Sequence, residues 1–520
     1  ISSRELAIKK ATENLSSGDI LIVAGKGHEN YQEYVNKKYF SDKECILKNI
    51  KLRNKGLYAD WKKNIIKEKI KKINFKYKKI INNASINSKE IKKNDIFFGI
   101  KGKNIDGNKF ANEAIKNGAI FSIVDKNYGK RKLNKIIVKN SLNFLTKISE
   151  WIRKVSNIEA IAITGSAGKT SLKELLGQSL NKLDSTAYSK KSFNNKYGVP
   201  LTLFNINKKN VFGVFEIGMD KKGEIFNLSR MIKPDMGVIT NVSYAHIKNF
   251  NNLSEIASTK SEIINNIKQG GKIVLNKDDK YFYYFKKKAL KKKLKIISFS
   301  KKKDANIKYI KKEKRKNNFV LYIEINGKKK NFIIKEKIFP YLENLLASIA
   351  IISNYYDFEK IEKNIFYDFK IPRSRGDFSK IKIKNKSINI IDESYNSNPL
   401  SLEFAINKFD QINVNSSSKK ILLGDMLELG KFTNKLHKDA SKYINRSKIN
   451  KVFVYGKYIR KTFNKIRPQK RGSILKNKKE ILNLMKNVLR NNDYLMVKGS
   501  NATGLNIIFS KFKKGNFNAI

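Results

Sequence analysis

From residue 158 onward, short apolar runs alternate with amphipathic stretches of helical length. Each run has the length of a strand buried on both faces, and polar or glycine-rich residues follow it directly. This alternation is typical of an α/β protein that has parallel sheets with helices on both faces. The first series of expected strands covers 158–164, 211–217, 236–241 and 272–276, and a second series after Pro372 covers 388–391, 420–423, 451–455 and 493–497.

The rest of the chain divides by the same criterion. The run Ile20 to Ala24 predicts a buried strand, and the Lys-rich stretch 301–335 alternates as a hairpin does. A length of 520 residues suggests about three domains with a further fragment. The expected units are a strand-and-helix fragment over 1–50, a linker over 51–75, a small α/β domain over 76–155, a central domain over 156–371 and a C-terminal domain over 372–520.

A glycine-rich loop follows the first strand of the central domain and opens a helix. Glycines let the backbone wrap around a phosphate, and the helix N-terminus attracts the anion. A lysine in such a loop reaches the β- and γ-phosphates, and a threonine hydroxyl binds Mg²⁺. The loop is two residues shorter than the usual phosphate loop. Its residues are Gly165, Ser166, Ala167, Gly168, Lys169, Thr170 and Ser171.

Two further polar residues lie where the next strands end. Glu216 closes the strand after the loop, where its carboxylate could bind Mg²⁺ opposite Thr170. His246 follows the strand 236–241, and we expect a metal or phosphate contact there, because open α/β sheets bind ligands at the carboxyl ends of their strands. An ordinary strand-end glutamate and a structural histidine are the alternatives.

Composition narrows the classes of protein. One cysteine and three scattered histidines exclude a disulfide framework and a cysteine-based zinc site. The chain carries no apolar run long enough to span a membrane, so we expect a cytoplasmic protein without a span. The net charge of +65 is spread over nearly the whole chain as lysine, which favours a solvated surface over a nucleic-acid partner. The chain starts at Ile1, and we expect a longer natural N-terminus.

Several motifs in order resemble the Mur ligase family. The loop from Thr164 to Thr170 is similar to the family's T-G-S/T-x-G-K-T. The stretches 193–202, 216–219, 239–246, 392–399, 423–430 and 497–500, together with 84–110 near the start, resemble those of members that add D-alanyl-D-alanine. The resemblance covers about residues 76–520 and implies a three-domain α/β fold with a phosphate-loop central domain and a Rossmann-like C-terminal domain.

The resemblance also implies a role for individual residues. Lys169, His246 and Lys260 would be catalytic, and Thr170, Glu216, His246 and a carbamylated Lys260 would bind Mg²⁺. Residues expected at the ATP site are the loop 165–171 with Asn344, Arg375, Asp392 and Glu393. Residues expected at the substrates are Ser88, Asp106, Gly107, Asn194, Asn195, Tyr395, Asn396 and Asn398.

The sequence departs from the family pattern at four positions. Asn87-Ser88-Lys89 replaces Asp-Ser-Arg, which weakens the uridine-site assignment. Pro340 stands where the family has a histidine, Glu393 where it has an aspartate, and Asn501 where it has an arginine. None of the four lies in the phosphate loop or among the proposed metal ligands, so we expect altered contacts with retained activity.

The first 50 residues resemble a different part of the family. The stretch Val23 to Gln32 is similar to the extreme C-terminus of members that add the third peptide residue. In those members the first glycine and the glutamate of G-K-G-H-E, here Gly25 and Glu29, contact diaminopimelate. The remainder of such an enzyme is missing, and we interpret the segment as a leftover strand-and-helix piece.

The resemblance implies a monomeric, ATP- and Mg²⁺-dependent peptide ligase of peptidoglycan synthesis. It would join D-alanyl-D-alanine to UDP-MurNAc-tripeptide through an acyl phosphate. One alternative is another amino-acid ligase of the same family, either the member that adds the third residue or one that adds glutamate to folate. An alternative of another class is a basic, nucleic-acid-stimulated ATPase, which would need a Walker-B aspartate and an arginine-rich face.

Overall fold

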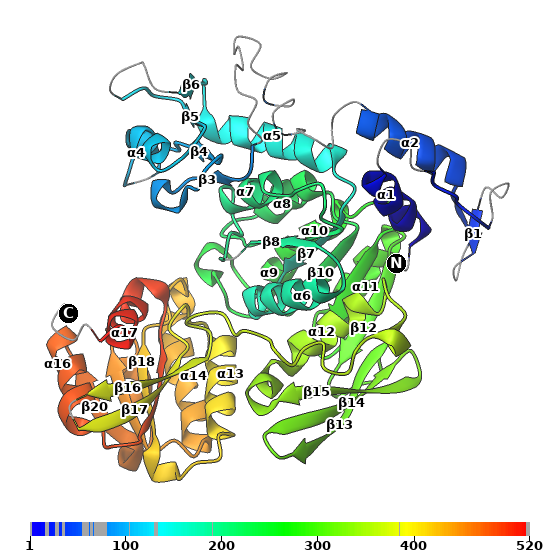
Figure 1. The fold of residues 1–520 in the computed structure, drawn as a ribbon. Helices are drawn as coiled ribbons and strands as arrows, with labels where there is room; N and C mark the ends of the chain where they lie inside the picture. Colours follow the sequence, from blue (N-terminus) through cyan, green and yellow to red (C-terminus); the bar gives the residue numbers. More distant parts are fainter. Residues whose placement is uncertain are drawn as a thin grey trace.

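Three sheets divide most of the chain in the computed structural model (Figure 1). The described residues are 3–15, 20–25, 31–33, 37–54, 62, 66, 81–102, 104–128, 134–189, 191–383 and 385–515. A four-stranded sheet, a nine-stranded sheet and a six-stranded sheet follow one another along the chain. The fold is thus α/β with three sheet domains, as expected.

The nine-stranded sheet is the centre of the molecule. Its strand order is β15-β14-β13-β12-β11-β10-β7-β9-β8. The parallel strands are β7 (Glu159–Thr164), β8 (Thr186–Tyr188), β9 (Phe212–Glu216), β10 (Met236–Ile239), β11 (Lys272–Asn276) and β12 (Lys295–Ser300). The strands predicted at 158–164, 211–217, 236–241 and 272–276 are confirmed as β7, β9, β10 and β11. The predicted excursion at 301–335 is an antiparallel meander of β13 (Ile307–Arg315), β14 (Asn318–Ile325) and β15 (Lys328–Lys335).

Helices cover both faces of this sheet because its central strands are apolar on both sides. Along β7, Ile161 and Ile163 pack into one core, and Ala160 and Ala162 pack into the other. Leucines of α6 (Lys169–Leu183) and α12 (Leu342–Ile352) complete the first core. The second core receives α7 (Gly198–Phe204), α8 (Glu224–Ile232), α9 (Leu253–Lys260), α10 (Glu262–Asn265) and α11 (Phe282–Lys291).

The C-terminal sheet repeats this architecture with a different edge. Its order is β16-β17-β21-β18-β19-β20, and only the β16–β17 pair is antiparallel. The strands are β16 (Asp377–Ile383), β17 (Lys386–Asp392), β18 (Lys419–Gly424), β19 (Lys451–Tyr455), β20 (Arg471–Leu475) and β21 (Tyr494–Lys498). The helices are α13 (Pro399–Asp410), α14 (Thr433–Arg446), α15 (Arg460–Phe463), α16 (Lys478–Asn483) and α17 (Leu505–Lys513).

The small N-terminal sheet is parallel throughout. Its strands β3 (Ala84–Ser85), β4 (Ile96–Phe98), β5 (Phe121–Val124) and β6 (Lys135–Ile137) lie in chain order. Helix α4 (Ala111–Lys116) packs on this sheet, and α5 (Ser141–Val155) joins it to α7 of the central domain.

The segment before residue 55 contradicts one prediction. It forms α1 (Arg4–Asn14), the short pair β1 (Tyr31–Glu33) and β2 (Lys37–Tyr39), and α2 (Asp42–Asn54). The run Ile20 to Ala24 is not the predicted buried strand, because Ile20 and Ile22 are 87% and 83% exposed and no ladder of the described residues includes the run. An apolar run becomes a buried strand only where neighbouring strands take its backbone hydrogen bonds. Glu29 lies outside the described residues, as does nearly all of the linker 51–75.

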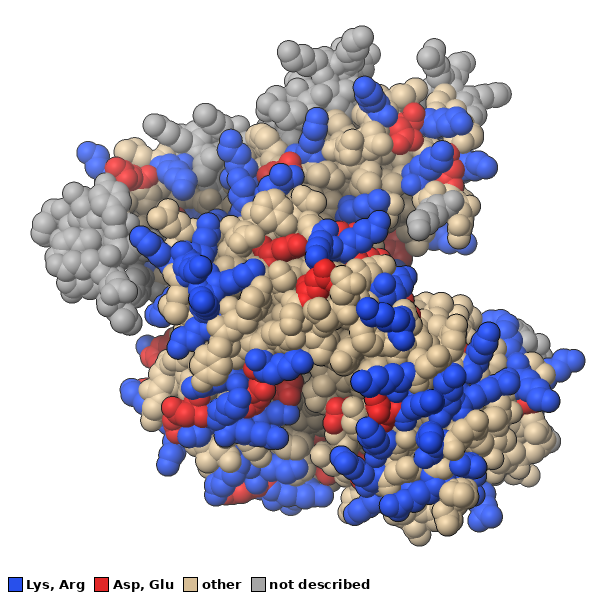
Figure 2. Space-filling model, turned by 180° about the vertical axis from the view of Figure 1, so that it is seen from behind, with Lys and Arg blue, Asp and Glu red and all other residues tan. Residues whose placement is uncertain are grey.

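Basic side chains cover much of the surface. On the face shown in Figure 2, basic side chains lie on both the upper and the lower part of the molecule, and acidic side chains lie among them. This distribution fits the Lys-rich composition of the whole chain. Among the helices of the described residues, none combines the length and the apolar character that crossing a bilayer demands.

Candidate functional site

The phosphate loop has a backbone that requires glycine. Gly165 and Gly168 have φ values of 148° and 83°, in the region that side chains disfavour. A Cβ on Gly165 would lie 1.8 Å from the Oγ1 atom of Thr240. The loop is braced from the end of β10, where Asn241 accepts hydrogen bonds from the backbone N–H groups of Ser166 (2.9 Å, to its carbonyl) and Ala167 (2.9 Å, to its side chain). Asn241 had no predicted role beyond its place in the stretch 239–246.

Lys169 begins α6 and folds back over the loop. Its Nζ donates a 2.6 Å hydrogen bond to the carbonyl of Gly165. Burial lowers the pKa of Lys169 from its usual value, Glu216 opposes this shift, and Arg375 adds to it. Because the described hydrogen bond of its Nζ is to a carbonyl of the loop itself, Lys169 lies where it can contact an anion bound by the loop.

Glu216 and Thr170 supply the oxygens that a hard cation prefers. Glu216 ends β9 and is 2% exposed, and its Oε1 accepts a 2.8 Å hydrogen bond from the Nδ2 of Asn194. Its Oε2 is buried and has no hydrogen-bond partner in the described part of the chain. An unpaired buried carboxylate oxygen is costly, and a metal ion would satisfy it. The residues present therefore fit a bound Mg²⁺.

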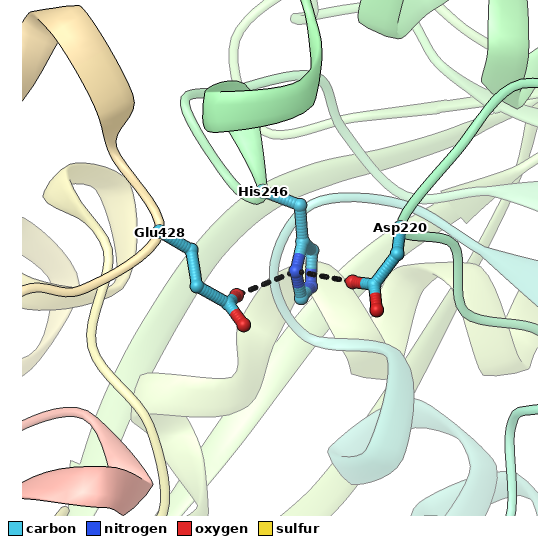
Figure 3. Close-up of side chains that lie close together, drawn as sticks. All are labelled: Asp220, His246 and Glu428. Carbon is cyan, nitrogen blue, oxygen red and sulfur yellow. Dashed lines mark ion pairs between the residues drawn. The ribbon is translucent and has the colours of Figure 1, made fainter.

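His246 lies between two carboxylates (Figure 3). Its Nδ1 is 3.0 Å from the Oδ1 of Asp220 and 2.6 Å from the Oε2 of Glu428, and one ligand atom from each residue lies within 4.8 Å of the others. Burial lowers the pKa of His246, but the two carboxylates outweigh this effect and raise it overall. Glu428 belongs to the C-terminal domain, so this cluster joins two domains. Asp220 and Glu428 had no predicted role, although Glu428 lies in the stretch 423–430.

Lys260 is the last residue of α9 and is 2% exposed. Its Nζ lies 4.0 Å from the Sδ of Met219, in the loop that follows Glu216. Burial lowers the pKa of Lys260 well below its usual value, the charge of Lys169 lowers it further, and Asp279 opposes both. Lys260 does not line the cavity described below, but its charge interacts with that of Lys169, which does.

A cavity of about 470 Å³ opens between the central and C-terminal domains. Its lining includes most of the residues predicted to bind ATP and metal. It also includes Tyr395, Asn396 and Asn398, which were predicted to contact the substrates. Predicted residues in its lining are Ser166, Ala167, Gly168, Lys169, Thr170, Ser171, Asn194, Glu216, His246, Asn344, Arg375, Glu393, Tyr395, Asn396 and Asn398. One volume next to the phosphate loop is thus bordered by both domains.

Arg375 reaches the phosphate loop from the C-terminal side of the cavity. Its guanidinium carbon lies 4.0 Å from the centre of the Tyr395 ring, and its Nη2 donates a 3.1 Å hydrogen bond to the Oγ of Ser192. Its carbonyl accepts a 2.6 Å hydrogen bond from the hydroxyl of Tyr341. Ser192 carried no signal in the sequence beyond its place beside the stretch 193–202.

Two predicted residues near the cavity are held by other groups. Asp392 is 1% exposed, and its carboxylate accepts hydrogen bonds from Ser374, Ser394 and the Nζ of Lys513. The expected nucleotide contact of Asp392 is therefore not supported, because its oxygens are occupied inside the domain. Asn195 accepts hydrogen bonds from two backbone N–H groups at the start of α7, which makes it a turn residue.

The predicted uridine-site residues lie on the small N-terminal sheet, away from this cavity. Asp106 accepts hydrogen bonds from Asn108 (2.7 Å) and from the hydroxyl of Tyr128 (2.8 Å). Gly107 packs so closely on Ile100 that a Cβ would lie 2.5 Å from its carbonyl oxygen. The hydroxyl of Ser88 donates a 3.1 Å hydrogen bond to Glu113, so Ser88 is engaged within the domain.

Comparison with known proteins covers the three sheet domains in order. Family models match as Mur ligase family catalytic domain over 80–150, Mur ligase middle domain over 163–352, and Mur ligase glutamate ligase domain over 378–501. All three matches lie between residues 80 and 501, so the resemblance seen in the first 50 residues stays a hypothesis.

The similarity to individual relatives extends over nearly the whole length of those proteins. The chain is 32% identical to the UDP-N-acetylmuramoyl-tripeptide–D-alanyl-D-alanine ligase of Buchnera aphidicola subsp. Baizongia pistaciae, over 84% of this chain and 93% of that protein. It is 30% identical to the ligase of the same name from Rickettsia prowazekii, over 83% and 95%.

Solved structures share the fold. A crystal structure of MurF from Acinetobacter baumannii has a TM-score of 0.70 at 23% identity and covers 84% of this chain and 94% of its own. A crystal structure of MurF ligase from Thermotoga maritima in complex with ADP has a TM-score of 0.68 at 22% identity and covers 84% and 98%. Three findings agree: the matched relatives, the order of the three family models along the chain, and a phosphate loop within the shared fold. They show that the chain belongs to the Mur ligase family, among its UDP-N-acetylmuramoyl-tripeptide–D-alanyl-D-alanine ligases.

Proposed function

We propose that the chain joins D-alanyl-D-alanine to UDP-MurNAc-tripeptide at the expense of ATP. The observation that carries this function is the cavity that holds Lys169, Thr170, Glu216 and Arg375 together with Tyr395 and its neighbours. Residues of the kind that bind a nucleoside triphosphate and polar residues of a second domain line this one cavity. The names of the relatives supply the two substrates, and the complex of a related enzyme with ADP supports the nucleotide.

The reaction has two steps. An oxygen of the tripeptide's terminal carboxylate attacks the γ-phosphorus of ATP, the bond to the β–γ bridging oxygen breaks, and ADP leaves. The amine of D-alanyl-D-alanine then attacks the carbonyl carbon of the acyl phosphate, loses a proton, and expels inorganic phosphate. Lys169 and Arg375 stabilise the negative charge of the transferred group, since positioning and electrostatics dominate phosphoryl transfer.

Thr170 and Glu216 would hold Mg²⁺, with His246 and Lys260 close to the same region. When bound, the ion neutralises phosphate charge and orients the oxygens of the transferred group. Burial lowers the pKa of Lys260 well below its usual value, which favours the neutral amine, the form that reacts with carbon dioxide to give a carbamate. A carbamate there would turn a buried amine into an anionic oxygen ligand.

Substrate contacts divide between domains. Asn344 and Glu393 would contact the nucleoside of ATP. Asn194, Tyr395, Asn396 and Asn398 would contact the peptide substrates at the cavity. The small sheet that carries Asp106 and Gly107 would bind the UDP end of the tripeptide. Because these groups lie on three domains, catalysis requires the domains to close on the bound substrates.

Coupled measurement of phosphate release tests the function. The complete mixture of ATP, Mg²⁺, UDP-MurNAc-tripeptide and D-alanyl-D-alanine should release phosphate steadily, and omission of either peptide substrate should stop it. Replacing D-alanyl-D-alanine by single amino acids tests the other ligases of the family. Phosphate release that DNA stimulates without the peptide substrates would contradict the proposal and favour a nucleic-acid-dependent ATPase.

A further inference from the structure

Ser192 joins the phosphate loop to the C-terminal domain. It lies between β8 and α7, half-buried, where no strand or helix fixes its position. Its Oγ is 3.0 Å from the Oγ1 of Thr170 and accepts a 3.1 Å hydrogen bond from the Nη2 of Arg375. One hydroxyl thus contacts both the loop and the arginine that approaches it from 183 residues farther along the chain.

The chemistry of the three groups limits how this bridge works. A serine hydroxyl has one donor and two acceptor positions, and a guanidinium can only donate. Arg375 therefore occupies an acceptor position of Ser192 and leaves the other acceptor and the proton. If Thr170 donates into the second acceptor position, both lone pairs of its own oxygen remain available to a ligand. Ser192 thereby influences the direction of the Thr170 hydroxyl as well as that of the guanidinium.

The backbone of Arg375 is anchored separately from its side chain. Its carbonyl is held by Tyr341, whose hydroxyl also accepts a 3.0 Å hydrogen bond from the Nζ of Lys408. The neighbouring residues Ser374 and Gly376 have φ values of 57° and 98°, so the chain turns sharply on both sides of Arg375. The ring of Tyr395 packs against one face of the guanidinium. Such stacking does not prevent the guanidinium from sliding parallel to the ring. The bond to Ser192 restricts that movement and directs the guanidinium toward the loop.

We infer that Ser192 is a positioning residue that links the Thr170 hydroxyl to Arg375 and so aligns the phosphate loop and the C-terminal domain on the γ-phosphate. The inference rests on the proposed function and adds a residue to it. In this role Ser192 contacts none of the three substrates. It acts through Thr170 and Arg375. Loss of its hydroxyl should therefore impair phosphoryl transfer while leaving the fold and the binding of ADP in place.

A double-mutant cycle on the full chain tests this coupling. Ser192→Ala should lower kcat about tenfold, as expected for a lost hydrogen bond to a charged group. The double variant with Arg375→Ala should be within about threefold of Arg375→Ala alone, because coupled residues are not additive. Ser192→Thr, which keeps the hydroxyl, should restore most of kcat. Ser416→Ala, at an exposed serine outside the cavity lining, is the matched control and should behave as the unmodified chain.

Three outcomes would overturn the inference. Effects of the two substitutions that multiply in the double variant would show that Ser192 and Arg375 act independently. Ser192→Thr as impaired as Ser192→Ala would show that the hydroxyl is not the group that matters. A fall of melting temperature or of Mg·ADP affinity that parallels the loss of kcat would show a structural role.

Binding of nucleotide analogues separates this inference from the proposed function. Calorimetry with Mg·ADP and with Mg·AMP-PNP needs no peptide substrate. Ser192→Ala should weaken AMP-PNP about tenfold and ADP by less than about threefold, because only AMP-PNP carries the γ-phosphate that Arg375 would reach. If the unmodified chain fails to ligate but shows this difference, the proposed function fails and the bridge stands. Equal weakening of both nucleotides contradicts the bridge whatever the enzyme's substrates.

Discussion

Two segments of the chain share a local pattern and end in opposite environments. In both, an apolar run leads into glycines and a lysine: Ile20 to Ala24 before Gly25 and Lys26, and β7 before Gly165 to Lys169. β7 is buried along nearly its full length and delivers the phosphate loop to the cavity. The run Ile20 to Ala24 has no regular secondary structure and is largely exposed, and its residues lie outside every sheet formed by the described part of the chain.

The difference lies in the neighbours. β7 pairs with β10 on one side and with β9 on the other, so that Ile161 lies opposite both Met236 and Val214. Both rows of its backbone groups are thereby satisfied and both its faces are covered by helices. The nearest described polar partner of the first run is Arg4, whose Nη2 donates a 2.8 Å hydrogen bond to the carbonyl of Ala24. A similar local pattern therefore becomes a buried strand only where tertiary structure supplies its partners.

The sharpest way to test this comparison is to remove the lysine that follows each apolar run in the sequence. Lys169→Ala should reduce ligation at least about 100-fold, because its charge stabilises the transferred phosphoryl group. Lys26→Ala should leave the rate unchanged. Coupled phosphate release gives the rates, and thermal unfolding controls for folding. A Lys169→Ala enzyme that keeps more than about a tenth of the activity would contradict its role.

Replacement of Lys260 tests whether a buried residue outside the phosphate loop matters for activity as much as the loop itself. Lys260→Ala should lower the rate at least about tenfold, because it removes the proposed carbamate ligand. Formate or acetate should restore part of the activity by occupying the vacated ligand position. The same carboxylates should have no effect on Lys169→Ala, which serves as the control. Near-normal activity of Lys260→Ala would remove Lys260 from the site, and an inactive variant without rescue would argue for a cation at that position.

Stability should differ between the two apolar runs as strongly as their burial does. Ile163→Ala, at a fully buried position of β7, should lower the free energy of unfolding by about 2–5 kcal/mol. Ile22→Ala, at an 83% exposed position, should change it by less than about 0.5 kcal/mol. Urea denaturation followed by tryptophan fluorescence measures both. A comparable loss at Ile22 would show that the first run is covered in solution.

Removal of residues 1–50 should have the smallest effect on activity. The clearest contact of this segment with the central domain is the 2.5 Å ion pair between Lys10 and Asp184, and the Lys10 side chain is about half exposed. Such a pair contributes about 1 kcal/mol at most. Asp184 also accepts a hydrogen bond from the hydroxyl of Tyr356, so the deletion would not leave it unpaired. The kcat and KM for ATP should match those of the full chain. A loss of soluble protein or of activity would show that the segment is part of the working enzyme.

Much of the architecture follows from local sequence. The eight strands that were predicted in the two large sheets match the observed ones to within about three residues at each end, because buried parallel strands are short, apolar and separated by helical periods. Strands β8, β12, β16 and β20 were not predicted. The phosphate loop could be placed because two glycines, a lysine and a threonine between a strand and a helix satisfy a requirement that is itself local. The positive φ values of Gly165 and Gly168 express that requirement in the structure.

What only tertiary structure decided is which distant residues meet. Nothing near Lys260 marks it as buried; its low pKa arises from the surroundings that α9 and the Met219 loop create. The carboxylates around His246 come from two domains, and Ser192, which contacts Thr170 within the central domain, meets Arg375 only because the C-terminal domain packs against the central one. The exposure of Ile20 and Ile22 was decided in the same way. The apolar period and the conformation of a tight glycine loop depend on neighbours along the chain, whereas strand pairing, burial, pKa and contacts across domains depend on partners that local patterns do not specify.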